Sequence, residues 1–279
     1  MDVTKESGEK EKFKRDKLCL SLEKAGAPKD TVGRVCKKVE QDLREGITTE
    51  ELFKRAFEYL STEHIEPAAR YSLRRGIAAL GPAGFLFEQY VERILQAYGF
   101  STRRDIFLQG VCVSHEVDLI AHKGKDHFLV EIKYHNRGGI KTDVTVAMYA
   151  DARLSDIAPV QEKEERGWGA QHAMWLITNT KFTTTAIQYG KCKRIRMTGW
   201  SYPQRESLEN LIVDKKLYPV TVLPSVARGK LNEFSRAGLM LVSDIAQHTP
   251  ETLARKIGFD VSRAEEMVSE ALVCLAGNK

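Results

Sequence analysis

Two short stretches decide the fold of this chain: HEVDLIA at His115–Ala121 and FLVEIKY at Phe128–Tyr134. Each is a run of apolar and β-branched residues, which is typical of a strand. The stretch between them, KGKD at Lys123–Asp126, is a turn signal. The pattern therefore predicts a β-hairpin that is largely buried.

Three charged side chains interrupt this apolar hairpin. Glu131 and Lys133 share one face of their strand, and Asp118 lies on the partner strand, so the three can converge at one end. Two carboxylates can hold Mg²⁺, and a lysine beside them can orient water and stabilise charge on a phosphate. The alternative is a turn aspartate with an exposed ion pair. The apolar neighbours favour a catalytic site, because charges on such a strand need a reason.

These residues resemble the PD-(D/E)xK restriction-endonuclease-like superfamily, most closely its Mrr-like branch. The resemblance covers about residues 81–222, with Val117 in place of the usual proline. It implies an α/β fold with a mixed sheet flanked by helices, and cutting of DNA with Mg²⁺ or Mn²⁺. Asp118 and Glu131 would be the metal ligands, and Lys133 would complete the catalytic set.

Further residues join this set by resemblance or by position. The segment GFLFE matches the helix that precedes the hairpin in the nuclease branch, so Glu88 is expected at the edge of the catalytic site; the alternative is a solvated helix face. His135 and Arg137 directly follow the hairpin and are well placed to meet a DNA backbone. Lys193 and Arg194 belong to the densest basic cluster, which attracts phosphates without reading sequence. The alternative for each is a solvated surface.

Residues 1–80 form the first predicted domain. Apolar residues recur there at three- and four-residue spacing, which predicts four helices. The segment resembles an ATP cone, a nucleotide-binding regulatory domain. By that resemblance Lys5 and Lys17 bind the phosphates of ATP or dATP, but Glu6 replaces an expected arginine. Two readings stay open: a working sensor, or a retained fold that has lost binding.

Residues 223–279 are predicted to be helical again. Short helices separated by glycines resemble a helix-hairpin-helix module, in which backbone amides at a glycine turn hold DNA phosphate. Here that turn is reduced to Ile257–Phe259, and the segment carries no net charge. Packing or dimerisation is therefore favoured over DNA binding, and a homodimer or higher homo-oligomer is expected.

Composition and sequence also bear on where in the cell the protein is expected. The chain has 279 residues and a net charge of +5, which is too mild to establish nucleic-acid binding. No apolar run is long enough to span a bilayer, and the N-terminus lacks the apolar core of a signal peptide. The five cysteines are scattered without a paired motif, which argues against a zinc site or a disulfide framework. A cytoplasmic protein without membrane partners is expected.

Together these features predict a metal-dependent DNA endonuclease, possible regulation by ATP or dATP as effector, and DNA as substrate. The alternative is a nuclease-inactive, nucleotide-responsive protein that binds DNA or controls oligomerisation.

Overall fold

The computed structural model describes residues 1–5, 8–81, 84–137, 139–164 and 172–276. The chain divides into two compact units: residues 77–217 form one, and residues 1–76 together with 218–279 form the other. The outer segments, predicted as separate domains at 1–80 and 223–279, thus share one unit.

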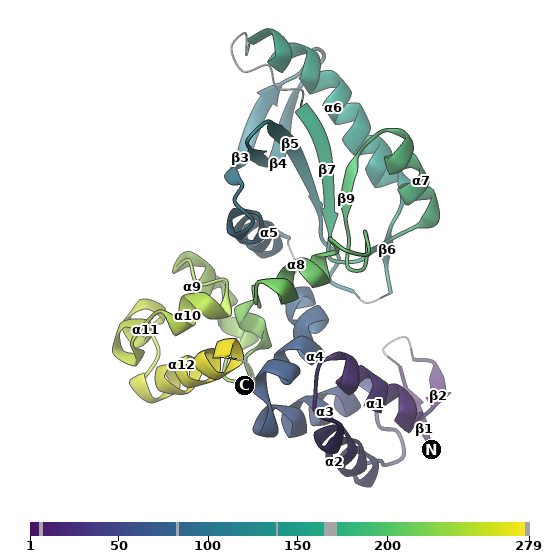
Figure 1. Cartoon of the computed structure of the whole chain (residues 1–279), viewed down its shortest axis with the longest axis vertical. Helices are drawn as coiled ribbons and strands as arrows, with labels where there is room; N and C mark the ends of the chain where they lie inside the picture. Colours follow the sequence, from purple (N-terminus) through teal and green to yellow (C-terminus); the bar gives the residue numbers. More distant parts are fainter. Residues whose placement is uncertain (6–7, 82–83, 138, 165–171, 277–279) are drawn as a thin grey trace. The chain divides into compact units, whose positions relative to one another are not determined.

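The unit of residues 77–217 is built around a five-stranded mixed sheet (Figure 1). Its strand order is β3-β4-β5-β7-β9; β3, β4 and β5 are antiparallel, and β5, β7 and β9 are parallel. Its elements are α5 (Phe85–Ala97), β3 (Ser101–Gln109), β4 (Ser114–Lys123), β5 (Asp126–Lys133), β6 (Lys141–Thr142), α6 (Val144–Glu164), β7 (His172–Thr178), β8 (Lys181–Phe182), α7 (Thr184–Cys192), β9 (Arg196–Thr198) and α8 (Leu208–Asp214). The mixed α/β class predicted for this region is confirmed.

The predicted hairpin is confirmed as β4 and β5. The two strands pair antiparallel from Leu119 opposite Val130 to Lys123 opposite Asp126, with the turn at Gly124. Apolar side chains of the sheet, including Leu129, pack with alanines of α6 in one buried cluster. The hairpin is therefore anchored by burial, as its apolar run indicates.

Helix α6 is longer than the sequence pattern suggested. The sequence alone predicts a helix over residues 144–157 and a solvated loop over the charged run at residues 161–166, yet the helix continues through Pro159 to Glu164. A proline removes one helical hydrogen bond and does not have to end a helix. The expectation is therefore wrong up to Glu164, and Glu165 and Arg166 lie outside the described residues.

The other unit begins with a two-stranded sheet and four helices and ends with further helices. Its elements are β1 (Asp2–Thr4), β2 (Lys10–Lys12), α1 (Arg15–Lys24), α2 (Lys29–Gln41), α3 (Thr49–Glu63), α4 (Ile65–Ala78, which ends in the middle unit), η1 (Val220–Val222), η2 (Arg228–Lys230), α9 (Leu231–Arg236), α10 (Val242–Ala246), α11 (Pro250–Ile257) and α12 (Val261–Ala276). The helices expected in both outer segments are thus present.

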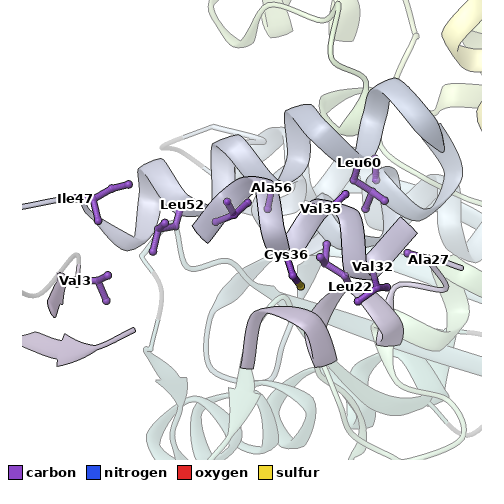
Figure 2. Packing of buried hydrophobic residues seen from close by; sticks show 12 residues of the cluster. Val3, Leu22, Ala27, Val32, Val35, Cys36, Ile47, Leu52, Ala56 and Leu60 are labelled. Atoms are coloured by element: carbon purple, nitrogen blue, oxygen red, sulfur yellow. The ribbon is translucent and has the colours of Figure 1, made fainter. Parts of the chain in front are cut away.

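A compact core holds the N-terminal helices together. Figure 2 shows its buried side chains, including Leu22 of α1, Val35 of α2 and Leu60 of α3, each fully buried. Val3 of β1 belongs to the same cluster, so the small sheet is packed onto the helices. These are the positions that the three- and four-residue spacing placed on buried helix faces.

Two local predictions in this segment need correction. The sequence predicts Thr49 as the cap of the third helix, but helix α3 is capped by Thr48. The Thr48 hydroxyl accepts a hydrogen bond from Glu51 N, and the Glu51 carboxylate accepts one from Thr48 N. A disulfide joins Cys19 of α1 to Cys36 of α2, so scattered cysteine positions were no evidence against this pairing.

The two chain segments of this unit meet through specific contacts at the end of α4. Arg70 Nε donates to the Tyr218 hydroxyl at 3.0 Å, and the Thr221 hydroxyl donates to Gly76 O at 2.8 Å. A Cβ on Gly76 would lie 2.9 Å from a methyl group of Val222. The glycine therefore permits a close approach that a larger residue would prevent.

Within the described ranges, no helix combines the length and the apolar character that crossing a bilayer requires.

Candidate functional site

The candidate site lies where β4 stops pairing with β5. Leu119 opposite Val130 is the last backbone pair, and one step further come Asp118 and Glu131. There the Asp118 Oδ2 accepts a hydrogen bond from the backbone N of Ile132 at 2.7 Å. This bond takes the place of a strand-to-strand bond and fixes the carboxylate against the end of β5.

A third carboxylate reaches this point from α5. Glu88 stands in the first turn of that helix, after Gly84 with φ +76°. Burial, together with the charges of Asp118 and Asp105, raises the pKa of Glu88 to about 7. Burial and then Asp118 likewise raise the pKa of Glu131 to about 7. The structure therefore brings the three predicted carboxylates within electrostatic reach of one another.

The side chains that could hold a metal ion at this place are carboxylates. In the part of the chain that the structure describes, no three His, Cys, Asp or Glu side chains form a complete metal-ligand group. Mg²⁺ requires only one or two carboxylates, because it retains several waters. The bonds from Ile132 N and from Arg153 each use one oxygen, of Asp118 and of Glu131 respectively. One oxygen of each carboxylate remains outside these two bonds.

Lys133 is the last residue of β5, and its side chain is exposed. Its charge lowers the pKa of Glu131, against the larger effect of burial. The ammonium group is thus close enough to influence the carboxylates while remaining accessible to a phosphate.

Two residues of this site, Arg153 and Asp105, are not predicted by the sequence pattern. Arg153 of α6 donates from Nη1 to Glu131 Oε2 at 2.5 Å, and both side chains are almost fully buried. Asp105 lies in β3 with φ +53°, and its charge raises the pKa of both Glu88 and Asp118. Aspartate tolerates this left-handed conformation better than most residues, but no sequence pattern announces it. The Arg153 contact spans 22 residues, so no local spacing reveals it.

The predicted DNA-binding residues fall in two places. His135 follows Lys133; its Nε2 contacts the Thr142 hydroxyl at 3.1 Å, and burial lowers its pKa. It is therefore a neutral polar group near pH 7, whereas Arg137, two residues on, is exposed.

The second place is the end of α7. There Lys193 pairs with Asp151 at 3.0 Å, and Arg194 is exposed in a left-handed conformation. Lys193 must therefore break its ion pair with Asp151 before it can bind a phosphate, whereas Arg194 is exposed.

The predicted nucleotide-binding lysines converge on one carboxylate. Lys5 Nζ lies 3.2 Å from Glu11 Oε2, and Lys17 Nζ lies 3.2 Å from Glu11 Oε1. Lys5 also pairs with Glu9 at 3.0 Å, while Glu6 lies outside the described residues. The structure thus brings Lys5 and Lys17 together around Glu11, which the sequence analysis did not single out.

Comparisons with known proteins agree with part of this description. The family model of the ATP cone domain matches residues 1–79, so the N-terminal domain is an ATP cone. An uncharacterized protein of Archaeoglobus fulgidus is 37% identical over 179 residues, which cover 64% of this chain and 96% of that protein.

A solved structure is similar as well. The crystal structure of protein of unknown function AF1548 matches with a TM-score of 0.58 and 35% identity, over 70% of this chain and 99% of that one.

Proposed function

We propose that this chain, which belongs to the same family as the uncharacterized Archaeoglobus fulgidus protein and carries an N-terminal ATP cone, is a metal-dependent DNA endonuclease. One observation carries the proposal: Glu88, Asp118 and Glu131 converge from α5, β4 and β5, and each is partly buried. Perturbed carboxylates grouped in this way are typical of catalytic sites. The resemblance of the hairpin to the Mrr-like nucleases supports the same assignment.

Each side chain has a distinct role in this proposal. Asp118 and Glu131 would hold Mg²⁺ or Mn²⁺, which, when bound, makes a coordinated water more acidic and offsets charge on the phosphate. Glu88 adds negative charge at the edge of the site and can accept a hydrogen bond from a water ligand. Lys133 donates hydrogen bonds to the attacking water or to a non-bridging phosphate oxygen.

The reaction is hydrolysis of a phosphodiester. The oxygen of a water bonds to phosphorus, one ester bond between phosphorus and oxygen breaks, and the leaving oxygen takes a proton. Lys133 stabilises the negative charge that builds up on the phosphate. The substrate strand is held by exposed cations, of which Arg137 lies four residues beyond Lys133 and Arg194 lies at the end of α7.

The ATP cone adds a regulatory input. We infer that ATP or dATP binds near Lys5 and Lys17, where the phosphates replace Glu11 as the partner of both ammonium groups. Nucleotide then acts as an effector rather than as the substrate, because the proposed hydrolytic residues all lie in the unit of residues 77–217.

The test is cleavage of plasmid, linear and methylated DNA with Mg²⁺, with and without ATP. D118A is expected to abolish cutting while folding and DNA binding persist. The matched control is D126A, which removes an exposed carboxylate from the turn of the same hairpin and should cut like the wild type. Undiminished cutting by D118A would refute the assignment.

A second candidate is a nucleotide-responsive regulator whose nuclease site is inactive. The observation that favours it is the Arg153–Glu131 ion pair, since a cation already contacts one proposed metal ligand. Calorimetric titration with Mg²⁺ or Mn²⁺ separates the two candidates: an inactive site binds neither ion, whereas a nuclease binds at least one.

A further inference from the structure

The buried contact between Arg153 and Glu131 is not required by the proposed chemistry. Arg153 reaches from α6 and donates through Nη1 to Glu131 Oε2, and the two side chains are 11% and 13% exposed. Its Nη2 donates to the Tyr149 hydroxyl at 2.8 Å, and the guanidinium carbon lies 4.7 Å from the centre of the Tyr149 ring. Arg153 is thus a buried cation held by one carboxylate and one phenol.

This arginine is incompletely satisfied. Among the described residues, Arg153 Nε is buried without a hydrogen-bond partner, although a guanidinium carries five donors. Its charge also acts on Asp118, so it is felt by both proposed metal ligands. A buried ion pair is weak evidence for stability, because the free energy needed to remove both charges from water offsets much of their mutual attraction. Packing alone therefore does not explain why Arg153 is buried beside Glu131.

Electrostatics defines that role. Arg153 places one positive charge where a divalent cation would also be attracted, and within the protein such charges interact strongly over a few ångströms. A cation and Arg153 therefore compete for the Glu131 carboxylate. Arginine can donate two parallel hydrogen bonds to phosphate oxygens. A phosphate that accepts these bonds from Arg153 would therefore free the Glu131 carboxylate for the metal ion.

We propose that Arg153 is the internal counter-ion of Glu131: it neutralises this carboxylate in the metal-free protein and releases it to the divalent cation when substrate phosphate accepts the guanidinium. The inference rests on the proposed metal-dependent nuclease function. Metal binding and DNA binding then favour each other, because each requires the contact between Arg153 and Glu131 to break. Arg153 is a positioning residue, and its effect is measured as metal affinity.

The experiment is calorimetric titration of the full chain with Mn²⁺ at pH 8, without DNA. R153M keeps the bulk of the side chain and removes its charge, and it is expected to bind Mn²⁺ at least tenfold more tightly than the wild type. R153K keeps the charge and should stay close to the wild type. The matched control is R70M, which breaks the Arg70–Glu66 ion pair in the other unit and should leave Mn²⁺ affinity unchanged.

A fold-preserving variant guards against loss of structure. Tyr149 is 54% exposed, so Y149F should fold, and loss of its hydroxyl removes one partner of Arg153. Y149F is expected to bind Mn²⁺ several-fold more tightly than the wild type; if R153M does not fold, Y149F decides the question.

The outcomes separate the two proposals. Unchanged or weaker Mn²⁺ binding by folded R153M overturns the counter-ion role, and if R153M does not fold, the same result for Y149F does so. The nuclease proposal stands in either case if the wild type binds metal and cuts DNA. Absence of Mn²⁺ binding in the wild type and in every variant overturns the metal site, and the counter-ion role fails with it.

Discussion

The buried Glu131 carboxylate should make the metal-free protein less stable as pH rises. Burial and the neighbouring Asp118 raise the pKa of Glu131 from 4.5 to about 7. Between these values the folded protein holds a proton that the unfolded chain has lost, so the free energy of unfolding falls with rising pH. The decrease begins near pH 4.5 and is complete above about pH 7.

The size of this effect follows from the two pKa values. A difference of about 2.5 pH units, at about 1.4 kcal/mol for each, gives roughly 3 kcal/mol as an upper limit. Relaxation and water entry around the carboxylate reduce this, so we expect roughly 1–3 kcal/mol from Glu131. The E131Q variant does not titrate at this position and should lose this share of the pH dependence. It will also be less stable because it loses the contact between Arg153 and the Glu131 carboxylate.

Urea unfolding in EDTA at pH 5 and pH 8 measures the difference, and tryptophan fluorescence reports on the correct unit. All three tryptophans of the chain lie between residues 77 and 217, and Trp175 and Trp200 are buried. The matched control is E116Q, which removes an exposed carboxylate from the same strand as Asp118. An equal loss of stability between pH 5 and pH 8 in wild type and E131Q would refute the reasoning.

Three further predictions concern the ATP cone. T48A removes the hydroxyl that caps α3 and should cost about 1 kcal/mol in thermal unfolding followed by circular dichroism, with T49A as the control. C19S opens the disulfide to Cys36, which closes a loop of 17 residues, and should cost about 3 kcal/mol; dithiothreitol should then destabilise the wild type but not C19S. E11Q weakens the hold on Lys5 and Lys17 and should tighten ATP binding several-fold in a calorimetric titration, whereas weaker binding would contradict the proposed phosphate contacts.

Local patterns were enough to predict the centre of the fold. The run at Phe128–Tyr134 became β5. The run at Ala173–Thr180, whose apolar residues predict a buried strand, became β7, which pairs parallel with β5. Both stretches are rich in apolar residues, and burial of those residues on the sheet faces favours a central strand. The helices of the outer segments were predicted for the same reason, because their buried faces repeat at helical spacing.

The remaining features depend on contacts between distant positions. Arg153 meets Glu131 only after α6 packs on the sheet, and a helical pattern shows which residues are apolar without showing which charge will be buried. The left-handed backbone at Asp105 arises within β3, a strand in which exposed and half-buried residues alternate, and no sequence pattern predicts that this aspartate belongs to the site. The joining of residues 1–76 with 218–279 likewise rests on long-range contacts such as Arg70 with Tyr218.

The end of α4 contacts a residue next to the candidate site. This helix carries residues of the cone and ends at Ala78, inside the unit of residues 77–217. The Tyr134 hydroxyl donates to Ala78 O at 2.5 Å, and Tyr134 directly follows Lys133. The Tyr134 ring also contacts Phe87, which precedes Glu88 in α5, with ring centres 5.4 Å apart. A shift of Ala78 would therefore act at once on Tyr134, which follows Lys133, and through Tyr134 on Phe87, which precedes Glu88.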